Sequence, residues 1–233
     1  MANSQFVHFL KENFPNNFNE LVDKFSRYAA ILERESKIHN LTAINPSEYE
    51  EKHFLDSLLL GKTYAFSNET LIDVGTGAGF PGLVLAIAYK DLKVTLLEPT
   101  RKRCDFLAKV VEALNLDNVT IINERAEDYV KVARGTYDLA TSRAVANLSI
   151  ILELSVPLLK VGGSALVMKG KSYPEELKDA QNAIDKLKIE CQKVDTHTLD
   201  SDSSIRMNAR FVKKSETSPK YPRPYSQIKK NPL

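Results

Sequence analysis

The run IDVGTGAGFPG at 72–82 is the part of the sequence whose residue types and spacing most clearly indicate chemistry. It continues a predicted strand, TLIDV at 70–74, into a glycine-rich turn. Gly75, Gly77 and Gly79 carry no side chain, so a bound molecule can approach the main chain closely there. In an open α/β sheet, ligands bind at the carboxyl ends of the strands. The turn therefore predicts a ligand site.

Two acidic residues complete the pattern around this turn. Asp73 lies near the end of the first predicted strand, where its carboxylate can face a positively charged group of a ligand. Glu98 directly follows a second apolar run, KVTLL at 93–97, where it can accept hydrogen bonds from both hydroxyls of a ribose. S-adenosylmethionine has a cationic end and a ribose. We therefore predict it as the cofactor, with S-adenosylhomocysteine as the product.

The same turn leaves a second class of ligand open. The string GAGFPG at 77–82 matches GxGxxG, the motif of nicotinamide and flavin dinucleotide sites. Such sites also use an acid near Glu98, so Asp73 and the position of the strand deep in the chain are what favour the methyl donor. Phe80 either walls the ligand or fills the core. A tight turn without any ligand is the plain structural alternative.

An arginine follows the fourth predicted strand, YDLATS at 137–142. Residues 141–144 read Thr-Ser-Arg-Ala, unlike the Asn-Pro-Pro-Tyr type of segment used by exocyclic-amine methyltransferases. The forked donors of Arg143 suit a guanine edge, a phosphate or a carboxylate, and the alternative is a structural ion pair. Because site residues gather at the carboxyl ends of parallel strands, we predict Arg143 as the catalytic residue.

Positive charge is concentrated late in the sequence, although the formal net charge is only +2. Seven Lys and Arg residues after Ala209 face a single acid, Glu216. Such clusters neutralise phosphates, and the binding that they support weakens with salt. Lys169, which ends the fifth predicted strand, is a further candidate for a phosphate contact. The predicted RNA-binding residues are Lys169, Lys220, Arg223, Lys229 and Lys230.

Several other classes of protein are disfavoured by the composition. No apolar run approaches a membrane span, and the start of the sequence lacks the cationic leader and continuous apolar stretch of a signal peptide. Cys104 and Cys191 have neither CxxC nor Cys/His spacing, so no disulfide or metal site is predicted. We expect a cytoplasmic, monomeric protein that binds no metal and no membrane.

The spacing of apolar residues divides the chain into three parts. Residues 1–68 read as an N-terminal extension of amphipathic helices, in which Ser47 and Glu50 resemble a capping box. Residues 69–214 alternate β-rich runs with helical stretches, which predicts a mostly parallel sheet with helices on both faces and an antiparallel pair at its end. Residues 215–233 form a basic tail. The predicted strands are TLIDV, KVTLLE, VTIIN, YDLATS, SALVMK, CQKVDTHTL and SIRMNARFVKK.

Several strings occur in an order that resembles one family. IDVGTGAGFPGLVLAI, LLEPTRKRCDFL, ERAEDY and TSRAVANL are similar to strings of the 16S rRNA guanine-N7 methyltransferase G family, also called glucose-inhibited division protein B. HNLTAI and KHFLDSL upstream, and KYPR and KNPL downstream, extend the resemblance over nearly the whole chain. GAGFPG together with SRAVANL is its most specific part. The tail departs from the family, because it lacks the glycine usually found between YPR and the terminal Lys-x-Pro-Leu.

The resemblance implies a seven-stranded Rossmann-like methyltransferase sheet with an N-terminal helical extension. It also implies that Lys52 and His53 face the pocket. The implied substrate is N7 of a guanine in 16S rRNA, within the 30S subunit or an assembly particle. N7 carries a free lone pair, so methyl transfer to it is an in-line displacement without a dedicated general base. The implied donor-binding residues are Gly75, Phe80, Ala126, Glu127 and Arg143.

Overall fold

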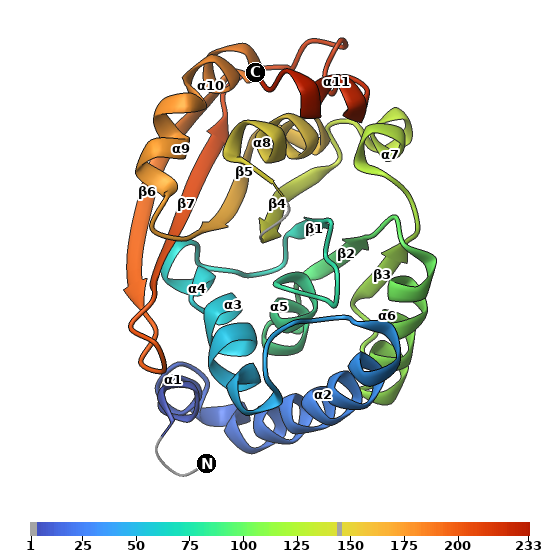
Figure 1. The fold of residues 1–233 in the computed structure, drawn as a ribbon, viewed down its shortest axis with the longest axis vertical. Helices are drawn as coiled ribbons and strands as arrows, with labels where there is room; N and C mark the ends of the chain where they lie inside the picture. Colours follow the sequence, from blue (N-terminus) through green and yellow to red (C-terminus); the bar gives the residue numbers. More distant parts are fainter. Residues whose placement is uncertain (1–3, 144–145) are drawn as a thin grey trace.

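A seven-stranded sheet forms the centre of the computed structural model, which describes residues 4–143 and 146–233. The strand order is β3-β2-β1-β4-β5-β7-β6 (Figure 1). Strands β1 to β5 are parallel to one another, whereas β7 lies antiparallel between β5 and β6, so β6 forms one edge. The predicted Rossmann-like α/β sheet with an antiparallel pair at its end is confirmed. The strands are β1 (Thr70–Val74), β2 (Lys93–Leu97), β3 (Val119–Ile122), β4 (Tyr137–Arg143), β5 (Leu159–Lys169), β6 (Ile189–Thr198) and β7 (Ile205–Lys213).

Side chains of each strand alternate between the two faces of the sheet, as strand geometry requires. In β1, Leu71 packs into one hydrophobic cluster and Ile72 into the other. The first cluster includes side chains of α5 and α6, and the second includes side chains of α7 to α11. Both faces are therefore covered, which explains why the central strands β1, β2 and β4 are so strongly apolar. The helices are α5 (Gly82–Ala88), α6 (Arg101–Ala113), α7 (Ala126–Ala133), α8 (Leu148–Ser155), α9 (Tyr173–Asp179), α10 (Gln181–Leu187) and α11 (Tyr225–Lys230).

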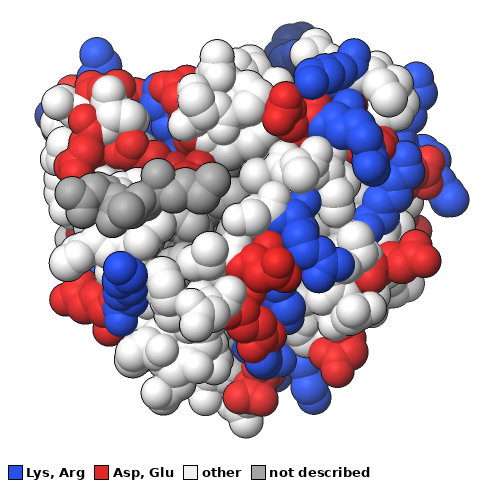
Figure 2. Space-filling view, turned by 90° about the horizontal axis from the view of Figure 1, so that it is seen from below, with Lys and Arg blue, Asp and Glu red and all other residues white. Residues whose placement is uncertain are grey.

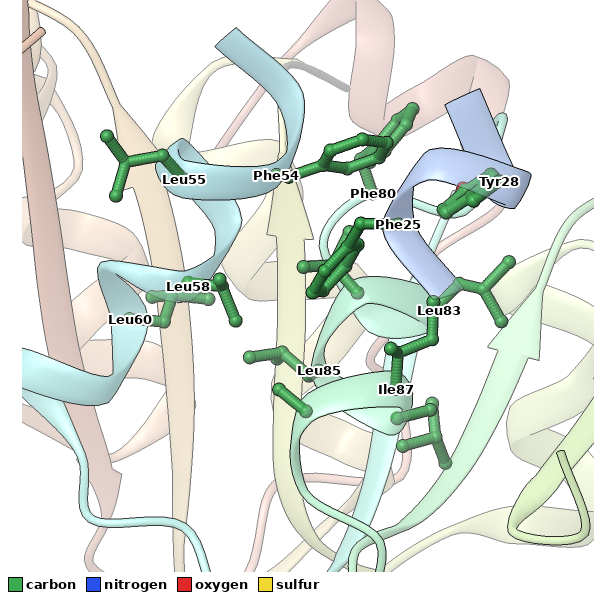
Figure 3. Close-up of a cluster of buried hydrophobic side chains, with 14 of the residues drawn as sticks. Phe25, Tyr28, Phe54, Leu55, Leu58, Leu60, Phe80, Leu83, Leu85 and Ile87 are labelled. Atoms are coloured by element: carbon green, nitrogen blue, oxygen red, sulfur yellow. The ribbon is translucent and has the colours of Figure 1, made fainter. Parts of the chain in front are cut away.

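The N-terminal extension packs onto α5 and α6 and shares their hydrophobic cluster. Its long helix α2 buries an apolar stripe in which Phe25 and Tyr28 are the largest side chains. Figure 3 shows these rings beside Phe54 and Phe80, at the place where the extension meets the glycine turn. The helical elements of the extension are α1 (Gln5–Asn13), a 3-10 turn (Pro15–Asn17), α2 (Phe18–His39), a 3-10 turn (Pro46–Glu48), a π-helix (Glu50–Leu55), α3 (Asp56–Leu58) and α4 (Leu60–Thr63).

The capping box predicted at Ser47 and Glu50 is wrong. The side chain of Asn45 accepts hydrogen bonds from both the main-chain nitrogen and the hydroxyl of Ser47, at 3.1 and 2.9 Å. Glu50 instead accepts from the hydroxyl of Ser4 in front of α1, at 3.2 Å. An Asn side chain readily accepts a hydrogen bond from the main chain two residues later. Here Asn45 also binds the hydroxyl of Ser47, which Ser47 would need in order to cap a helix.

The surface toward which α1 and α2 lie carries both signs of charge. Figure 2 shows this face from below, with Lys and Arg interspersed with Asp and Glu. Along α2 the two signs form ion pairs, such as Lys24 with Glu20 at 3.0 Å and Lys37 with Glu33 at 3.0 Å. Within residues 4–143 and 146–233, no helix is long and apolar enough to cross a membrane.

Candidate functional site

The glycine turn after β1 has one residue facing open space and another packed against the extension. Gly77 has φ +62°, and a Cβ added there would meet nothing within 4 Å. Gly79 has φ +96°, and a Cβ there would lie 2.5 Å from the hydroxyl of Tyr28. That hydroxyl donates to the carbonyl of Ala78. The turn therefore presents its main chain to a cavity on one side and is held by α2 on the other.

Asp73 lies behind the turn and not in the cavity. Its Oδ2 accepts from the hydroxyl of Thr76 at 2.6 Å and from the main-chain nitrogen of Gly82 at 2.8 Å. The residue is 0% exposed, and its burial raises the pKa of the carboxyl to about 6. The sequence suggested that Asp73 faces a cationic ligand group; in the structure it instead fixes both ends of the turn, because its strand position points into the protein.

Glu98 is positioned as the sequence predicted, at the end of β2 beside the turn. Its Oε2 accepts from the main-chain nitrogen of Gly77 at 3.0 Å, and its Oε1 accepts from that of Thr100 at 2.9 Å. Arg103 approaches Oε2 to 3.8 Å. A carboxylate has further lone pairs, so Glu98 can still accept hydrogen bonds from a ligand.

Two neighbouring cavities meet at the turn. The larger has a volume of about 480 Å³, and the smaller, of about 140 Å³, shares Gly75 and Pro99 with it. The smaller cavity is the one that contains Ala126 and Glu127. Residues lining the larger cavity include Thr42, His53, Gly75, Gly77, Phe80, Glu98 and Arg143.

The residues of these two cavities fit S-adenosylmethionine. The larger cavity offers the main chain at Gly77, where a Cβ would project into open space, and the carboxylate of Glu98 for ribose hydroxyls. The smaller cavity is lined mainly by apolar side chains and has Glu127 as an acceptor. A ligand with a polar amino-acid end and a flat purine therefore finds matching surroundings at both ends.

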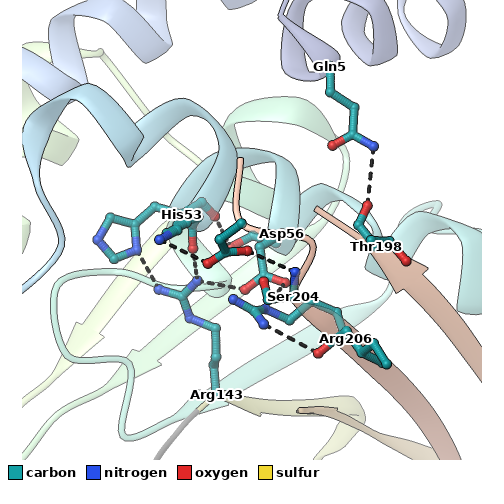
Figure 4. Close-up of polar contacts among 11 residues, drawn as sticks. Gln5, His53, Asp56, Arg143, Thr198, Ser204 and Arg206 are labelled. Carbon is teal, nitrogen blue, oxygen red and sulfur yellow. Dashed lines mark hydrogen bonds and ion pairs between the residues drawn. The ribbon is translucent and has the colours of Figure 1, made fainter. Parts of the chain in front are cut away.

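Arg143 is held by the π-helix of the N-terminal extension. Its Nη1 donates to the carbonyl of Lys52 at 2.8 Å and to Oδ2 of Asp56 at 3.1 Å, and its Nη2 donates to Nδ1 of His53 at 2.7 Å (Figure 4). The sequence left open a site position or a structural ion pair for Arg143, and the structure shows that it forms an ion pair with Asp56 and also lines the cavity. Ala144, the last residue of the Thr-Ser-Arg-Ala segment, lies outside the described residues.

His53 has a defined tautomer in this arrangement. Because a guanidinium only donates, Nδ1 of His53 accepts from Arg143, and Nε2 carries the proton and donates to the hydroxyl of Thr42 at 2.9 Å. Burial lowers the pKa of His53 to about 3, and the charge of Arg143 acts in the same direction. His53 is therefore neutral at physiological pH.

Phe80 is both a wall of the cavity and a core residue. Its ring stacks on His53 with the centroids 4.1 Å apart and on Tyr28 with the centroids 5.6 Å apart. The guanidinium carbon of Arg143 lies 4.8 Å from the centroid of Phe80. Phe80 is only 5% exposed, so it positions the polar groups around it.

A third cavity, of about 550 Å³, lies on the other side of Arg143 and His53. Lys169 lines it, but its Nζ donates to the carbonyl of Ala146 at 2.6 Å and pairs with Glu176 at 2.8 Å. Arg206 of β7 also lines it and pairs with Asp56 at 3.3 Å. Burial raises the pKa of Asp56, while Arg143 and Arg206 oppose that shift. The charged side chains that line this cavity are four cations, Lys52, Arg143, Lys169 and Arg206, and two acids, Asp56 and Glu176. It shares His53 and Arg143 with the 480 Å³ cavity at the turn.

A family model described as rRNA small subunit methyltransferase G matches residues 21–205. The chain is 44% identical to the ribosomal RNA small subunit methyltransferase G of Clostridium beijerinckii, with 92% of this chain and 91% of the relative covered. It is 40% identical to that of Mesoplasma florum, with 91% and 89% covered. The chain belongs to the rRNA small subunit methyltransferase G family. It is an S-adenosylmethionine-dependent methyltransferase, so the methyl-donor interpretation of the turn is confirmed over the dinucleotide one.

Solved structures support the fold of this member of the methyltransferase G family. A SAM-dependent methyltransferase from Aquifex aeolicus superposes with a TM-score of 0.57 at 20% identity, covering 76% of this chain and 97% of the other. The TYW2 protein of M. jannaschii, solved in complex with AdoMet, superposes with a TM-score of 0.53 at 18% identity, covering 68% and 76%.

The basic tail of this methyltransferase G family member is folded onto the sheet domain. Arg223 donates from Nε and Nη2 to the two oxygens of Glu153 at 2.8 and 2.6 Å, and Glu153 is 0% exposed. Lys220, Lys229 and Lys230 are exposed. The sequence placed these four cations together in one RNA-binding group, whereas the structure pairs the half-buried Arg223 with the buried Glu153 and leaves the three lysines at the surface.

Sequence reasoning from the residues missed the partners of Arg143. Asp56 is a buried acid within the apolar string KHFLDSL, and this mismatch with its neighbours could have marked it. Arg206 and Thr42 carry no comparable mark, because their roles depend on long-range packing. Lys52 and His53 do line the cavities, as the family resemblance implied.

Proposed function

We propose that this protein transfers the methyl group of S-adenosylmethionine to N7 of a guanine in 16S rRNA. The observation that carries the proposal is that Arg143 and His53 line both the donor cavity at the glycine turn and the third cavity, so the two cavities adjoin at these side chains. A donor in one cavity and a base in the other would meet beside these two side chains. The similarity to rRNA small subunit methyltransferases G supports rRNA as the acceptor.

The side chains present suit a reaction that moves no proton. When bound, S-adenosylmethionine supplies an electrophilic methyl group on a sulfonium. The N7 lone pair forms the new bond to carbon as the carbon–sulfur bond breaks, and no hydrogen leaves N7. His53 is unsuited to act as a base, because its Nδ1 is engaged by Arg143 and its pKa is lowered to about 3. The chain therefore has to bind, orient and exclude water.

Acceptor recognition falls to the cationic side chains of the third cavity. Arg143 and Arg206 can donate to guanine O6 or to a phosphate while leaving N7 free. We propose that Lys169 reaches a phosphate by exchanging its contact with Glu176. Lys220, Lys229 and Lys230 would add contacts to rRNA from the folded tail.

The three predicted segments divide the work in this proposal. Residues 1–68 cap the donor cavity and hold Arg143, residues 69–214 carry the donor and acceptor cavities, and residues 215–233 extend the cationic surface. We propose a cytoplasmic monomer that acts on the 30S subunit or an assembly particle, where neighbouring ribosomal components would assist binding.

Methyl transfer to RNA with a labelled donor tests the proposal. The protein is incubated with labelled S-adenosylmethionine and either 30S subunits lacking the modification or naked 16S rRNA, and the modified base is mapped. We expect label on one guanine N7, with 30S subunits preferred. Label on an amine, on a pyrimidine or on no RNA would refute the guanine-N7 assignment. Calorimetry with NAD in parallel checks that the site is specific for the methyl donor.

Replacing Arg143 with Lys tests its place in the site. The variant keeps the charge next to Asp56 but loses the fork that reaches Asp56 and His53 together. We expect kcat/KM to fall by about 100-fold, the usual cost of losing one preorganised donor. Arg134→Lys is the matched control, because Arg134 also donates to a main-chain carbonyl, that of Tyr221. Wild-type turnover in the Arg143 variant would remove Arg143 from the mechanism.

A further inference from the structure

Tyr225, the first residue of α11, lines the small cavity that adjoins the glycine turn. The other residues of this cavity come from the ends of β1 and β2, the segment between β3 and α7, the start of α7, and α8, so residues more than 70 positions apart in sequence meet there. Its volume is about 140 Å³. A whole small ligand needs about 300–1,000 Å³, so this cavity suits one part of a larger ligand. Its lining includes Leu97, Pro99, Ala126, Glu127, Leu154 and Tyr225.

The segment that carries Tyr225 is fixed in place by buried contacts. Ahead of α11, Arg223 donates from its side chain and its main-chain nitrogen to the fully buried Glu153 of α8. Ile228 of α11 is 0% exposed, and Leu233 is 8% exposed in the same hydrophobic cluster. Figure 1 shows α11 beside α7 and α8. Tyr225 is therefore held against the cavity by contacts on both sides of it in the sequence.

The two cavities at the turn differ in chemistry, and this difference decides which part of the donor each one takes. The larger is polar, with Glu98, Thr42 and Arg143 around the exposed main chain of the turn. The smaller is mainly apolar and carries an aromatic ring. A purine ring prefers flat apolar surroundings and an aromatic neighbour, whereas a ribose and a zwitterionic amino-acid end require hydrogen bonds.

We infer that α11 forms a wall of the adenine end of the donor site and that Tyr225 contacts the adenine. The inference rests on the proposed binding of S-adenosylmethionine at the glycine turn and extends that site to the C-terminal segment. In this arrangement the segment predicted to serve RNA alone has two separate surfaces. The lysines of α11 face outward, and Tyr225 faces the donor.

Calorimetry with S-adenosylhomocysteine and with adenosine tests the contact. We expect Tyr225→Ala to bind both ligands about 10-fold more weakly, which corresponds to about 1.4 kcal/mol. Tyr225→Phe should stay within about 2-fold of the wild type, because the ring and not the hydroxyl is invoked. Ser226→Ala, an exposed neighbour on the same helix, should bind as the wild type does. A folded Tyr225→Ala protein with wild-type affinity for both ligands would overturn the inference.

Hydrogen exchange on the unmutated protein gives a second test that does not depend on how the variant folds. On saturation with S-adenosylhomocysteine, exchange should slow in the turn at 75–80 and also in α11. Slowing in the turn with no change in α11 would overturn the role of α11 while leaving the donor site intact. No binding and no slowing anywhere would instead refute the donor site proposed at the turn.

Discussion

Arg143 is oriented by three acceptors of different kinds, namely a main-chain carbonyl, a carboxylate and a ring nitrogen. A guanidinium has five donor hydrogens, so some remain for a ligand after these bonds are made. All three acceptors belong to the protein itself, so the protein's own contacts orient Arg143. His53 contributes to this only in its neutral form, because a protonated ring could not accept at Nδ1.

The neutral state of His53 predicts how stability depends on pH. An unfolded chain protonates this histidine below about pH 6.5, whereas the folded protein does so only near pH 3. The unfolded state therefore binds more protons in this window, and the free energy of unfolding falls as the pH is lowered. At pH 5 the contribution amounts to about 2 kcal/mol. We expect urea unfolding of the wild type to show a smaller net loss between pH 7 and pH 5, because the raised pKa of Asp73, about 6, stabilises the folded protein in the same window.

His53→Gln isolates this contribution, because the amide can accept from Arg143 and donate to Thr42 without titrating. Its free energy of unfolding should fall by about 2 kcal/mol less than that of the wild type over the same pH range. Asp73, whose pKa is raised to about 6, acts in the opposite direction but is common to both proteins. His39→Gln, at an exposed position, is the control. Parallel pH profiles for wild type and His53→Gln would contradict the prediction.

At the scale of elements, the turn between β1 and α5 is fixed from three directions. Asp73 holds it from below, Glu98 binds its main chain from β2, and Tyr28 of α2 donates to the carbonyl of Ala78. The main chain of the turn, where we propose that the donor binds, is therefore shaped partly by the N-terminal extension. This explains why Gly79 has no room for a side chain while Gly77 has ample space.

The two glycines predict opposite outcomes for the same substitution. Gly77→Ala should cost about 1–2 kcal/mol from its left-handed backbone and still fold, but its methyl group would occupy donor space and lower donor affinity by at least about 10-fold. Gly79→Ala adds contacts of 2.5 Å to Tyr28 and 2.9 Å to Leu83, so we expect a loss of about 3 kcal/mol or more in stability. Thermal unfolding and calorimetry measure the two effects. Equal stability of the two variants would contradict the conclusion that Gly79 is packed against Tyr28 and Leu83 while Gly77 faces open space.

The sequence predicted the central elements of the sheet well because strands such as β1, β2 and β4 lie between helix layers and are strongly apolar. TLIDV, for example, matches β1 residue for residue. The π-helix at 50–55 was not predicted, since its main-chain pattern depends on the tertiary contacts of His53 and Lys52 with Arg143.

The site residues divide in the same way, into those set by local sequence pattern and those set by tertiary contacts. Residues of the turn and of the strand ends were predictable because their place follows from local pattern and sheet topology. Asp56, Arg206 and Tyr225 were not, because the chain brings them to the site from other segments. The position of Asp73 behind the turn also required the three-dimensional path of β1.

At the scale of the molecule, three segments converge on one cavity system. The extension supplies His53, the sheet supplies Glu98 and Arg143, and the tail supplies Tyr225. The tail is attached through Arg223 and Glu153, a pair in which the carboxylate is fully buried. Its exposed lysines are thus displayed from a fixed position.

The folded tail predicts different phenotypes for its cations. Arg223→Ala leaves Glu153 buried without its partner and should lower the free energy of unfolding by about 3 kcal/mol. Combined replacement of Lys220, Lys229 and Lys230 with Ala should leave stability unchanged. It should reduce the magnitude of the slope of log K against log salt for rRNA binding by about 2. An unchanged slope in the triple variant would show that these lysines make no phosphate contacts.

The edge position of β6 has a consequence for solubility. A long strand at the edge of a sheet can template pairing with another chain, and such edges are a route to aggregation. β6 carries three features that oppose this. Lys193 and Asp195 place opposite charges along it, its pairing with β7 shifts register after Cys191, and Gln5 of α1 donates to the carbonyl of Thr198 at its end. We expect that replacing Lys193 and Asp195 with apolar residues would make this edge prone to aggregation.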